Sequence, residues 1–140
     1  MNAPLYTPEI LRLAASLPAP RELERVDGRA EMRSPTCGST IATTVACDGE
    51  GRVIALTQSV SACAFGQAAA SLLERSATGK SAGEVRSAVD QLQEWLSGQR
   101  SNPGDWTGLD ALAPARSKAG RHGSILLPFR ALLAALEQAR

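Results

Sequence analysis

The sequence predicts an α+β fold, in which helices pack on one face of a small antiparallel sheet of about three strands. Three observations lead to this prediction. Alternating apolar and β-branched residues over 39–47 and 52–60 indicate two strands joined by a turn. Apolar residues at helical spacing are concentrated after residue 64. Early strands followed by late helices are typical of helices that cover one face of an antiparallel sheet.

The first predicted elements are a helix and a short edge strand. Thr7, Pro8 and Glu9 make a typical helix start, with a capping hydroxyl, a proline at the first helical position and an acid in the first turn. Pro18 ends this helix, because proline cannot continue its hydrogen bonding. Residues 29–33 are predicted to form an edge strand.

The next two strands are predicted to pair as a hairpin. If residues 48–51 form the loop, Cys47 pairs with Arg52 and Ile41 pairs with Gln58. This register places the apolar residues of both strands on one face, whereas a slip of one residue would send them to opposite faces. The predicted inner face consists of Ile41, Thr43, Val45, Ile54, Leu56 and Val60.

The second half of the chain is predicted to be mostly helical. Residues 64–76 carry an apolar stripe, and Gly79 can end that helix. Ser81 and Glu84 form a capping box for the next helix, which Gly98 ends. Beyond it we expect a short helical turn within 108–113, irregular chain over 115–123, and a last helix that begins between Ser124 and Pro128.

Length and composition exclude several classes of protein. The chain has 140 residues, 44% of them hydrophobic, so residues 1–140 are expected to form a single domain. A net charge of +1 gives no reason to expect nucleic-acid or anionic-membrane binding. No apolar run is long enough to span a bilayer, and the N-terminus lacks the pattern of a signal peptide, so a cytoplasmic protein is expected. No phosphate-binding loop or catalytic triad pattern is present, which argues against an enzyme.

Two of the three cysteines form the candidate site. The predicted hairpin places Cys37 opposite Ala62, next to Cys63, so the two thiols should lie close together. Cys63 also precedes a helix, whose N-terminus stabilises a thiolate. Two such thiolates suit iron, zinc or persulfide chemistry, and the alternative is two ordinary small residues near a strand end. Cys47 continues the apolar face and is expected to be a buried hydrophobic residue.

Four stretches in this order resemble the U-type iron–sulfur scaffold family, the N-terminal domain of NifU and its stand-alone relatives. They are residues 34–38, 62–73, 79–81 and 121–132. The resemblance implies an α+β domain that binds a labile iron–sulfur cluster, iron or zinc. It also implies partners: a cysteine desulfurase that supplies sulfur, and apo iron–sulfur proteins that receive clusters.

The family's site uses three cysteines and an aspartate, and this chain matches half of them. Cys37 and Cys63 match the first two cysteines, whereas Ser39 stands at the aspartate position and Ser124 at the third cysteine position. Neutral hydroxyls are poor metal ligands beside thiolates. The family's arginine matches Arg121.

The only histidine, His122, lies two residues before Ser124. It could bring an imidazole near the thiols, and the alternative is a solvent-facing histidine in a loop. Both interpretations stay open from the sequence.

The leading hypothesis is an iron–sulfur assembly scaffold-like protein that binds iron or a cluster, or accepts sulfur, through Cys37 and Cys63. A cluster could then lie across a homodimer, with two thiols from each subunit. The alternative is a cluster-free interaction or regulatory module that binds a cysteine desulfurase or another assembly partner.

Overall fold

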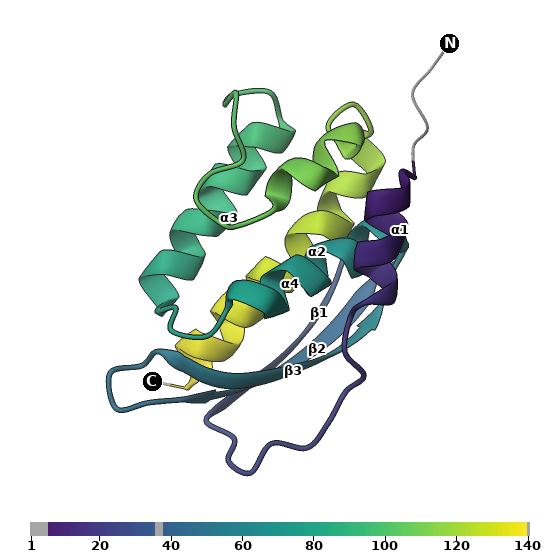
Figure 1. Ribbon diagram of the computed structural model, residues 1–140. Coiled ribbons are helices and arrows are strands. Elements are labelled where there is room, and N and C mark those ends of the chain that lie inside the picture. Colours follow the sequence, from purple (N-terminus) through teal and green to yellow (C-terminus); the bar gives the residue numbers. More distant parts are fainter. Residues whose placement is uncertain (1–5, 36–37, 140) are drawn as a thin grey trace.

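A computed structural model of the chain describes residues 6–35 and 38–139 (Figure 1). Strands β1, β2 and β3 form one antiparallel sheet in the order β1-β2-β3. Helices α2 and α4 pack on one face of this sheet, and α3 lies against α4 on the side away from the strands. The α+β prediction is therefore confirmed. The elements are α1 (Pro8–Ala15), β1 (Gly28–Arg33), β2 (Thr40–Cys47), β3 (Val53–Ser61), α2 (Ala64–Ser76), α3 (Ala82–Leu96), the 3-10 helix η1 (Leu109–Ala115) and α4 (Ala119–Gln138).

The β2–β3 hairpin exists, but its predicted register was wrong by two residues. Ile41 pairs with Val60 rather than with Gln58. One residue of the shift comes from the turn, which the Asp48 N–H closes by donating to the Arg52 carbonyl at 2.9 Å. The other comes from a bulge, because Ala46 pairs with Ala55 whereas Cys47 pairs with Val53.

The bulge explains why most of the predicted inner face survived the error. A shift of two residues keeps each side chain on its own face. Ile41, Val45 and Leu56 are buried as predicted. Ile54, the extra residue of the bulge, was wrongly placed: it is 51% exposed, and Val53 is buried instead.

Local capping signals set the starts of α1 and α3. The Thr7 hydroxyl accepts a hydrogen bond from the Ile10 N–H at 3.1 Å. Ser81 and Glu84 form both halves of the predicted capping box. Each cap satisfies backbone N–H groups that have no partner inside the helix, and so each fixes where the helix begins.

The start of the last helix was predicted wrongly. α4 begins at Ala119, so residues 119–123 are helical rather than irregular, and Pro128 lies inside the helix. Proline removes one helical hydrogen bond, here the bond that the Ser124 carbonyl would accept. Ten buried residues of α4 offset that loss by packing on the sheet, α2 and α3. Among the described residues, no helix is long and apolar enough to cross a membrane.

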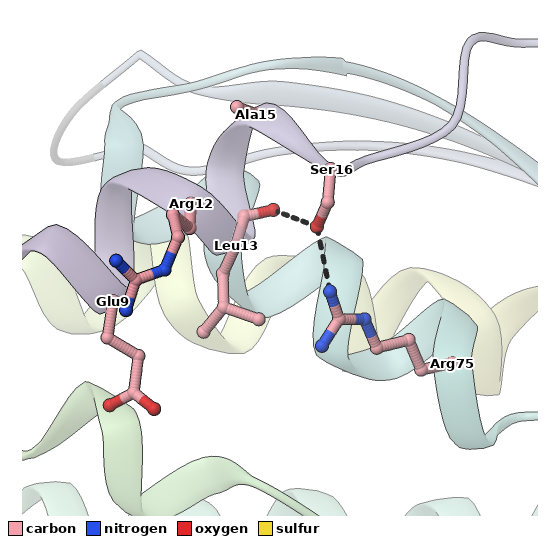
Figure 2. Close-up of a pocket in the computed structure, with 6 residues that line it drawn as sticks. All are labelled: Glu9, Arg12, Leu13, Ala15, Ser16 and Arg75. Carbon is pink, nitrogen blue, oxygen red and sulfur yellow. Dashed lines mark hydrogen bonds between the residues drawn. The ribbon is translucent and has the colours of Figure 1, made fainter.

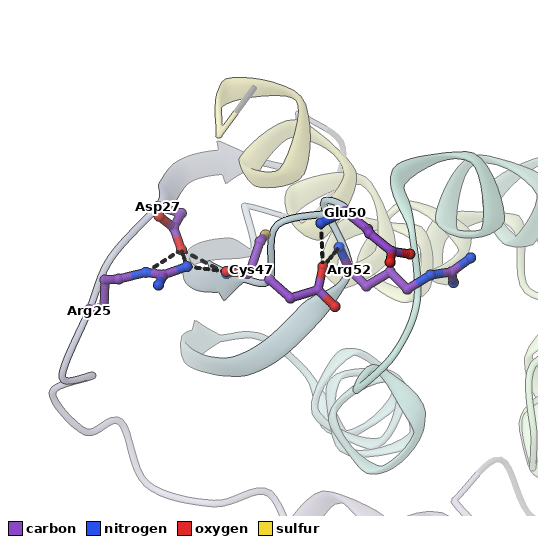
Figure 3. Close-up of polar contacts among 6 residues, drawn as sticks. Arg25, Asp27, Cys47, Glu50 and Arg52 are labelled. Atoms are coloured by element: carbon purple, nitrogen blue, oxygen red, sulfur yellow. Dashed lines mark hydrogen bonds and ion pairs between the residues drawn. The ribbon is translucent and has the colours of Figure 1, made fainter.

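A cluster of charge-assisted hydrogen bonds ties the start of β1 to the hairpin turn (Figure 3). The Asp27 carboxylate accepts the Cys47 N–H at 2.7 Å and pairs with Arg25 at 2.9 Å. Arg25 in turn donates to the Cys47 carbonyl. The Cys47 N–H, and then Arg25, lower the pKa of the Asp27 carboxyl. Hydrogen bonds from the backbone N–H groups of Arg52 and Glu50 lower the pKa of Asp48 in the same way.

These lowered values predict an acid-sensitive fold. A carboxyl whose pKa is lower in the folded state stabilises the protein above its unfolded pKa, and that contribution is lost as the pH falls through the folded pKa. We expect Asp27→Asn to be less stable than the wild type near pH 7, and the difference to shrink at an acid pH below 3.8, the ordinary pKa of an aspartate, as the folded carboxylate becomes protonated. Denaturant unfolding of both proteins at the two pH values measures this. The same difference in unfolding free energy between the two proteins at both pH values would contradict the role of the Asp27 charge.

Candidate functional site

Three of the predicted site residues that the structure describes, Ser39, Cys63 and Ser124, lie toward one end of the sheet. Thr40, the first residue of β2, pairs with Ser61, the last residue of β3. The chain before Thr40 and the chain after Ser61 therefore leave the sheet side by side, toward Ser39 and Cys63 respectively. Cys37 lies outside the described residues, so its predicted position beside Cys63 stays a prediction.

The β1–β2 turn is held closed beside this end of the sheet. The Ser34 N–H donates to the Ser39 carbonyl at 2.8 Å, and the Gly38 N–H donates to the Ser34 carbonyl at 3.1 Å. Gly38 has a φ of 72°, which favours glycine at that position. These two bonds anchor the backbone on the side of the turn that leads into β2.

Cys63 is the N-cap residue of α2 and is partly buried against the core. Its carbonyl accepts the first helical hydrogen bond, from the Gln67 N–H at 3.0 Å. The first turn of α2 contains no acidic residue. Cys63 therefore lies at the positive end of the α2 dipole, with no carboxylate of the same turn beside it.

Ser39 and Ser124 are brought together although 85 residues separate them in sequence. Their Oγ atoms lie 2.6 Å apart, in hydrogen-bond contact. Both residues are nearly inaccessible, Ser39 at 4% and Ser124 at 1% exposure. The hydrogen bond joins the β1–β2 turn to the second turn of α4.

Gly66, which was not singled out from the sequence, lies where α2 packs against Ser124 of α4. A Cβ atom on Gly66 would lie 2.7 Å from the Ala62 Cβ and 3.3 Å from the Ser124 Cβ. The backbone of α2 therefore runs directly against α4 where Ser124 lies. Gly66 stands in one of the stretches that carry the family resemblance, but only the packing shows why a side chain is excluded.

Arg121 and His122 lie on the first turn of α4 and face different directions. Arg121 is three residues before Ser124, so it shares that face of the helix. His122 is two residues before Ser124, a rotation of about 200°. Its Nε2 donates to the carbonyls of Ala115 at 3.0 Å and Arg116 at 3.1 Å. The ring thus points to the end of η1, away from Ser124. His122 itself is helical and partly buried.

Cys47 is separate from the candidate site. It ends β2 at the hairpin turn and is 6% exposed. Burial raises the pKa of its thiol, the opposite of what a reactive thiolate needs. Thr40 and Cys47 are seven residue steps apart along an extended strand, or about 23 Å. The third cysteine therefore serves as a matched control for Cys63.

The described residues around Ser39, Cys63 and Ser124 do not supply the ligands of a four-ligand metal site. Over residues 6–35 and 38–139, no three His, Cys, Asp or Glu side chains lie close enough to hold a metal ion. The hydroxyls of Ser39 and Ser124 are neutral and are hydrogen-bonded to each other. A closed zinc site requires four strong ligands, and clusters are held mainly by thiolates. The described residues thus do not fit a resident zinc ion or a four-ligand cluster.

A hollow of about 530 Å³ between α1 and the end of α2 lies outside this site (Figure 2). The side chains around it include Glu9, Arg12 and Arg75. Arg75 donates to the Ser16 hydroxyl at 2.9 Å, and the Ser16 Oγ also lies 3.0 Å from the Ser71 Oγ. These bonds join α1 to α2, and the hollow contains none of the predicted site residues that the structure describes.

The sequence matches no protein-family profile and no curated protein. Solved structures do match it. The crystal structure of a nitrogen-fixing NifU-like protein (N-terminal) from Brucella abortus is 30% identical, with a TM-score of 0.88 over 96% of this chain and 94% of that chain. A putative iron–sulfur cluster assembly scaffold protein for the SUF system of Fervidobacterium islandicum AW-1 is 17% identical, with a TM-score of 0.83 over 94% of this chain and 96% of that chain. The second likeness is one of fold alone.

Proposed function

The chain belongs to the U-type, NifU-like iron–sulfur scaffold family, and we propose that it is a scaffold-like protein of iron–sulfur cluster assembly. In this proposal Cys37 and Cys63 hold iron, a cluster or transferred sulfur as cargo. The position of Cys63 is the observation that carries the proposal, because Cys63 is the N-cap residue of α2 and lies at the edge of the core. A cysteine thiolate is both a nucleophile and a soft metal ligand.

Sulfur would be accepted by a simple exchange. The Cys63 thiolate attacks the outer sulfur of a persulfide on a cysteine desulfurase. A sulfur–sulfur bond forms on Cys63, the donor's sulfur–sulfur bond breaks, and the donor cysteine leaves as a thiolate. The persulfide proton stays with the transferred sulfur, so the step needs no further oxidant or reductant.

The partners follow from this role. A cysteine desulfurase supplies sulfur, and apo iron–sulfur proteins receive the assembled product, in the cytoplasm. Because each chain offers two thiols, a homodimer would supply the four thiolates that hold a cluster. Neither nucleic acid nor a membrane enters the proposal, and the protein acts as a carrier rather than as an enzyme.

The test compares Cys63→Ser with Cys47→Ser, whose thiol is buried at the other end of β2. Incubation without air with ferrous iron and sulfide should give thiolate-to-iron charge-transfer absorption in the wild type and in Cys47→Ser. We expect Cys63→Ser to lose most of that absorption and the associated iron. After incubation with a persulfidated desulfurase, intact-peptide mass spectrometry should find one extra sulfur atom on Cys63.

Two results would contradict the cargo role of Cys63. One is iron and sulfur loading in Cys63→Ser equal to that of Cys47→Ser. The other is a wild-type protein that takes up neither iron nor sulfur under these conditions.

The second candidate is the cluster-free module that binds a desulfurase or another assembly partner. The hydrogen bond between Ser39 and Ser124 favours it, because two positions that carry metal ligands in the family are here neutral and paired. A Cys37→Ser, Cys63→Ser double variant that still binds its partner and changes the partner's activity would favour this candidate over the first.

A further inference from the structure

The hydrogen bond between Ser39 and Ser124 has consequences beyond cargo binding. It is a direct side-chain link between Ser39, just before β2, and α4, and both of its oxygens are shielded from water. A buried bond between distant segments restricts them more than a surface bond does, because water cannot replace either partner.

The geometry of this bond is incompatible with a metal ion shared by the two hydroxyls. Two oxygen ligands of one tetrahedral zinc ion lie about 3.4 Å apart, given metal–oxygen distances near 2.1 Å. The Oγ atoms of Ser39 and Ser124 are 2.6 Å apart, at the short end of the hydrogen-bond range. Metal insertion would have to break this bond and move the two oxygens apart.

The packing around Ser124 resists such a movement. The α2 backbone at Gly66 lies so close that even a Cβ atom would sit 3.3 Å from the Ser124 carbonyl oxygen. Ser124 itself is 1% exposed, on a helix whose inner face is packed on the sheet. Neutral hydroxyls bind zinc too weakly to offset the cost of expanding such an interior, whereas a thiolate and a carboxylate bind it strongly enough to do so.

We propose that the Ser39–Ser124 bond is a metal-free latch. It fastens the β1–β2 turn to α4 without a resident metal ion, so the folded state gains no stability from zinc or iron, and any metal at Cys63 is held only as transient cargo. The inference rests on the proposed function only for where the cargo site lies. The latch itself follows from the hydrogen bond, its burial and the packing of α2.

The experiment measures thermal unfolding and metal content of the full chain. We expect purified wild-type protein to melt at the same temperature with and without a chelator. Ser124→Ala should melt several degrees lower in both buffers. The matched control is Ser71→Ala, which removes a second serine pair of the described residues, Ser16–Ser71, between α1 and α2. It should also melt lower, because the buried Ser71 hydroxyl and its contact with Ser16 are lost away from the site.

The decisive variant is the double substitution Ser39→Asp, Ser124→Cys, which replaces the latch with two strong metal ligands. It should retain zinc at roughly one ion per chain, melt higher with zinc and melt lower with a chelator. The same double variant built on Ser71→Ala should respond to zinc in the same way, whereas Ser71→Ala alone should show no response to metal.

Three outcomes would overturn the latch. They are a wild-type protein that retains stoichiometric metal and melts lower on chelation, a Ser124→Ala variant that melts at the wild-type temperature, and a folded double variant that binds no more zinc than the wild type. If the double variant does not fold, the effect of the chelator on the wild type and the melting temperature of Ser124→Ala still test the latch. None of these measurements uses a sulfur donor, so failure of the latch is distinguishable from failure of sulfur or iron loading at Cys63.

Discussion

Replacing Gly28 with alanine is expected to lower the free energy of unfolding by about 3 kcal/mol. A Cβ atom at this first residue of β1 would lie 2.0 Å from the Ala135 carbonyl oxygen and 3.0 Å from the Ala139 Cβ. The first contact is with helix backbone, which cannot rotate away as a side chain would. α4 would have to separate from β1, losing part of the packing that covers the sheet.

Urea unfolding measures this effect as a lower midpoint with an unchanged slope. The control is Gly120→Ala in the first turn of α4, where a Cβ atom would meet nothing within 4 Å. Since alanine favours helix over glycine by up to about 1 kcal/mol, Gly120→Ala should be neutral or slightly stabilising. A Gly28→Ala variant as stable as Gly120→Ala would show that α4 can shift on β1 without loss.

Replacing Gly66 with alanine is expected to lower the free energy of unfolding by about 1–3 kcal/mol and to weaken cargo loading. The new methyl group would meet the Ala62 Cβ at 2.7 Å, so the N-terminal turn of α2 has to move. That turn carries Cys63 as its N-cap and packs on Ser124. The substitution therefore disturbs the thiol and the serine pair together, although neither is mutated.

The matched control for Gly66 is Gly83, which also lies in the first turn of a helix. A Cβ atom on Gly83 would have its closest contact at 3.9 Å, with the Ser81 Oγ. Gly83→Ala should therefore leave both unfolding and iron–sulfur absorption close to wild-type values. Equal stability and equal loading in Gly66→Ala and Gly83→Ala would contradict the close packing of α2 against α4.

Short-range signals in the sequence were sufficient for most element boundaries. Thr7 and the Ser81–Glu84 box act within three residues of chain, so their effect on a helix start does not depend on what the helix later packs against. The alternation in β2 likewise fixes its inner face through the two-residue repeat of a strand, even though the partner register was wrong.

Predictions failed where distant contacts override a local preference. Pro128 favours a helix start by its own chemistry, but α4 runs through it because the helix is buried along much of its length. Ile54 is apolar enough for the core, yet the bulge turns it to solvent. His122 was expected in a loop or beside the thiols, and the end of η1 holds it instead.

The sequence alone determined the α+β class, the hairpin that leads toward the cysteines, and the replacement of two ligand positions by Ser39 and Ser124. The first two conclusions need only residue identity and periodicity along the chain, whereas the third is what the resemblance to the scaffold family implies. The tertiary structure decided that the two serines bond to each other and that Gly28 and Gly66 exclude any side chain. Contacts across 85 residues, and the space left between packed backbones, arise only when sheet and helices are assembled.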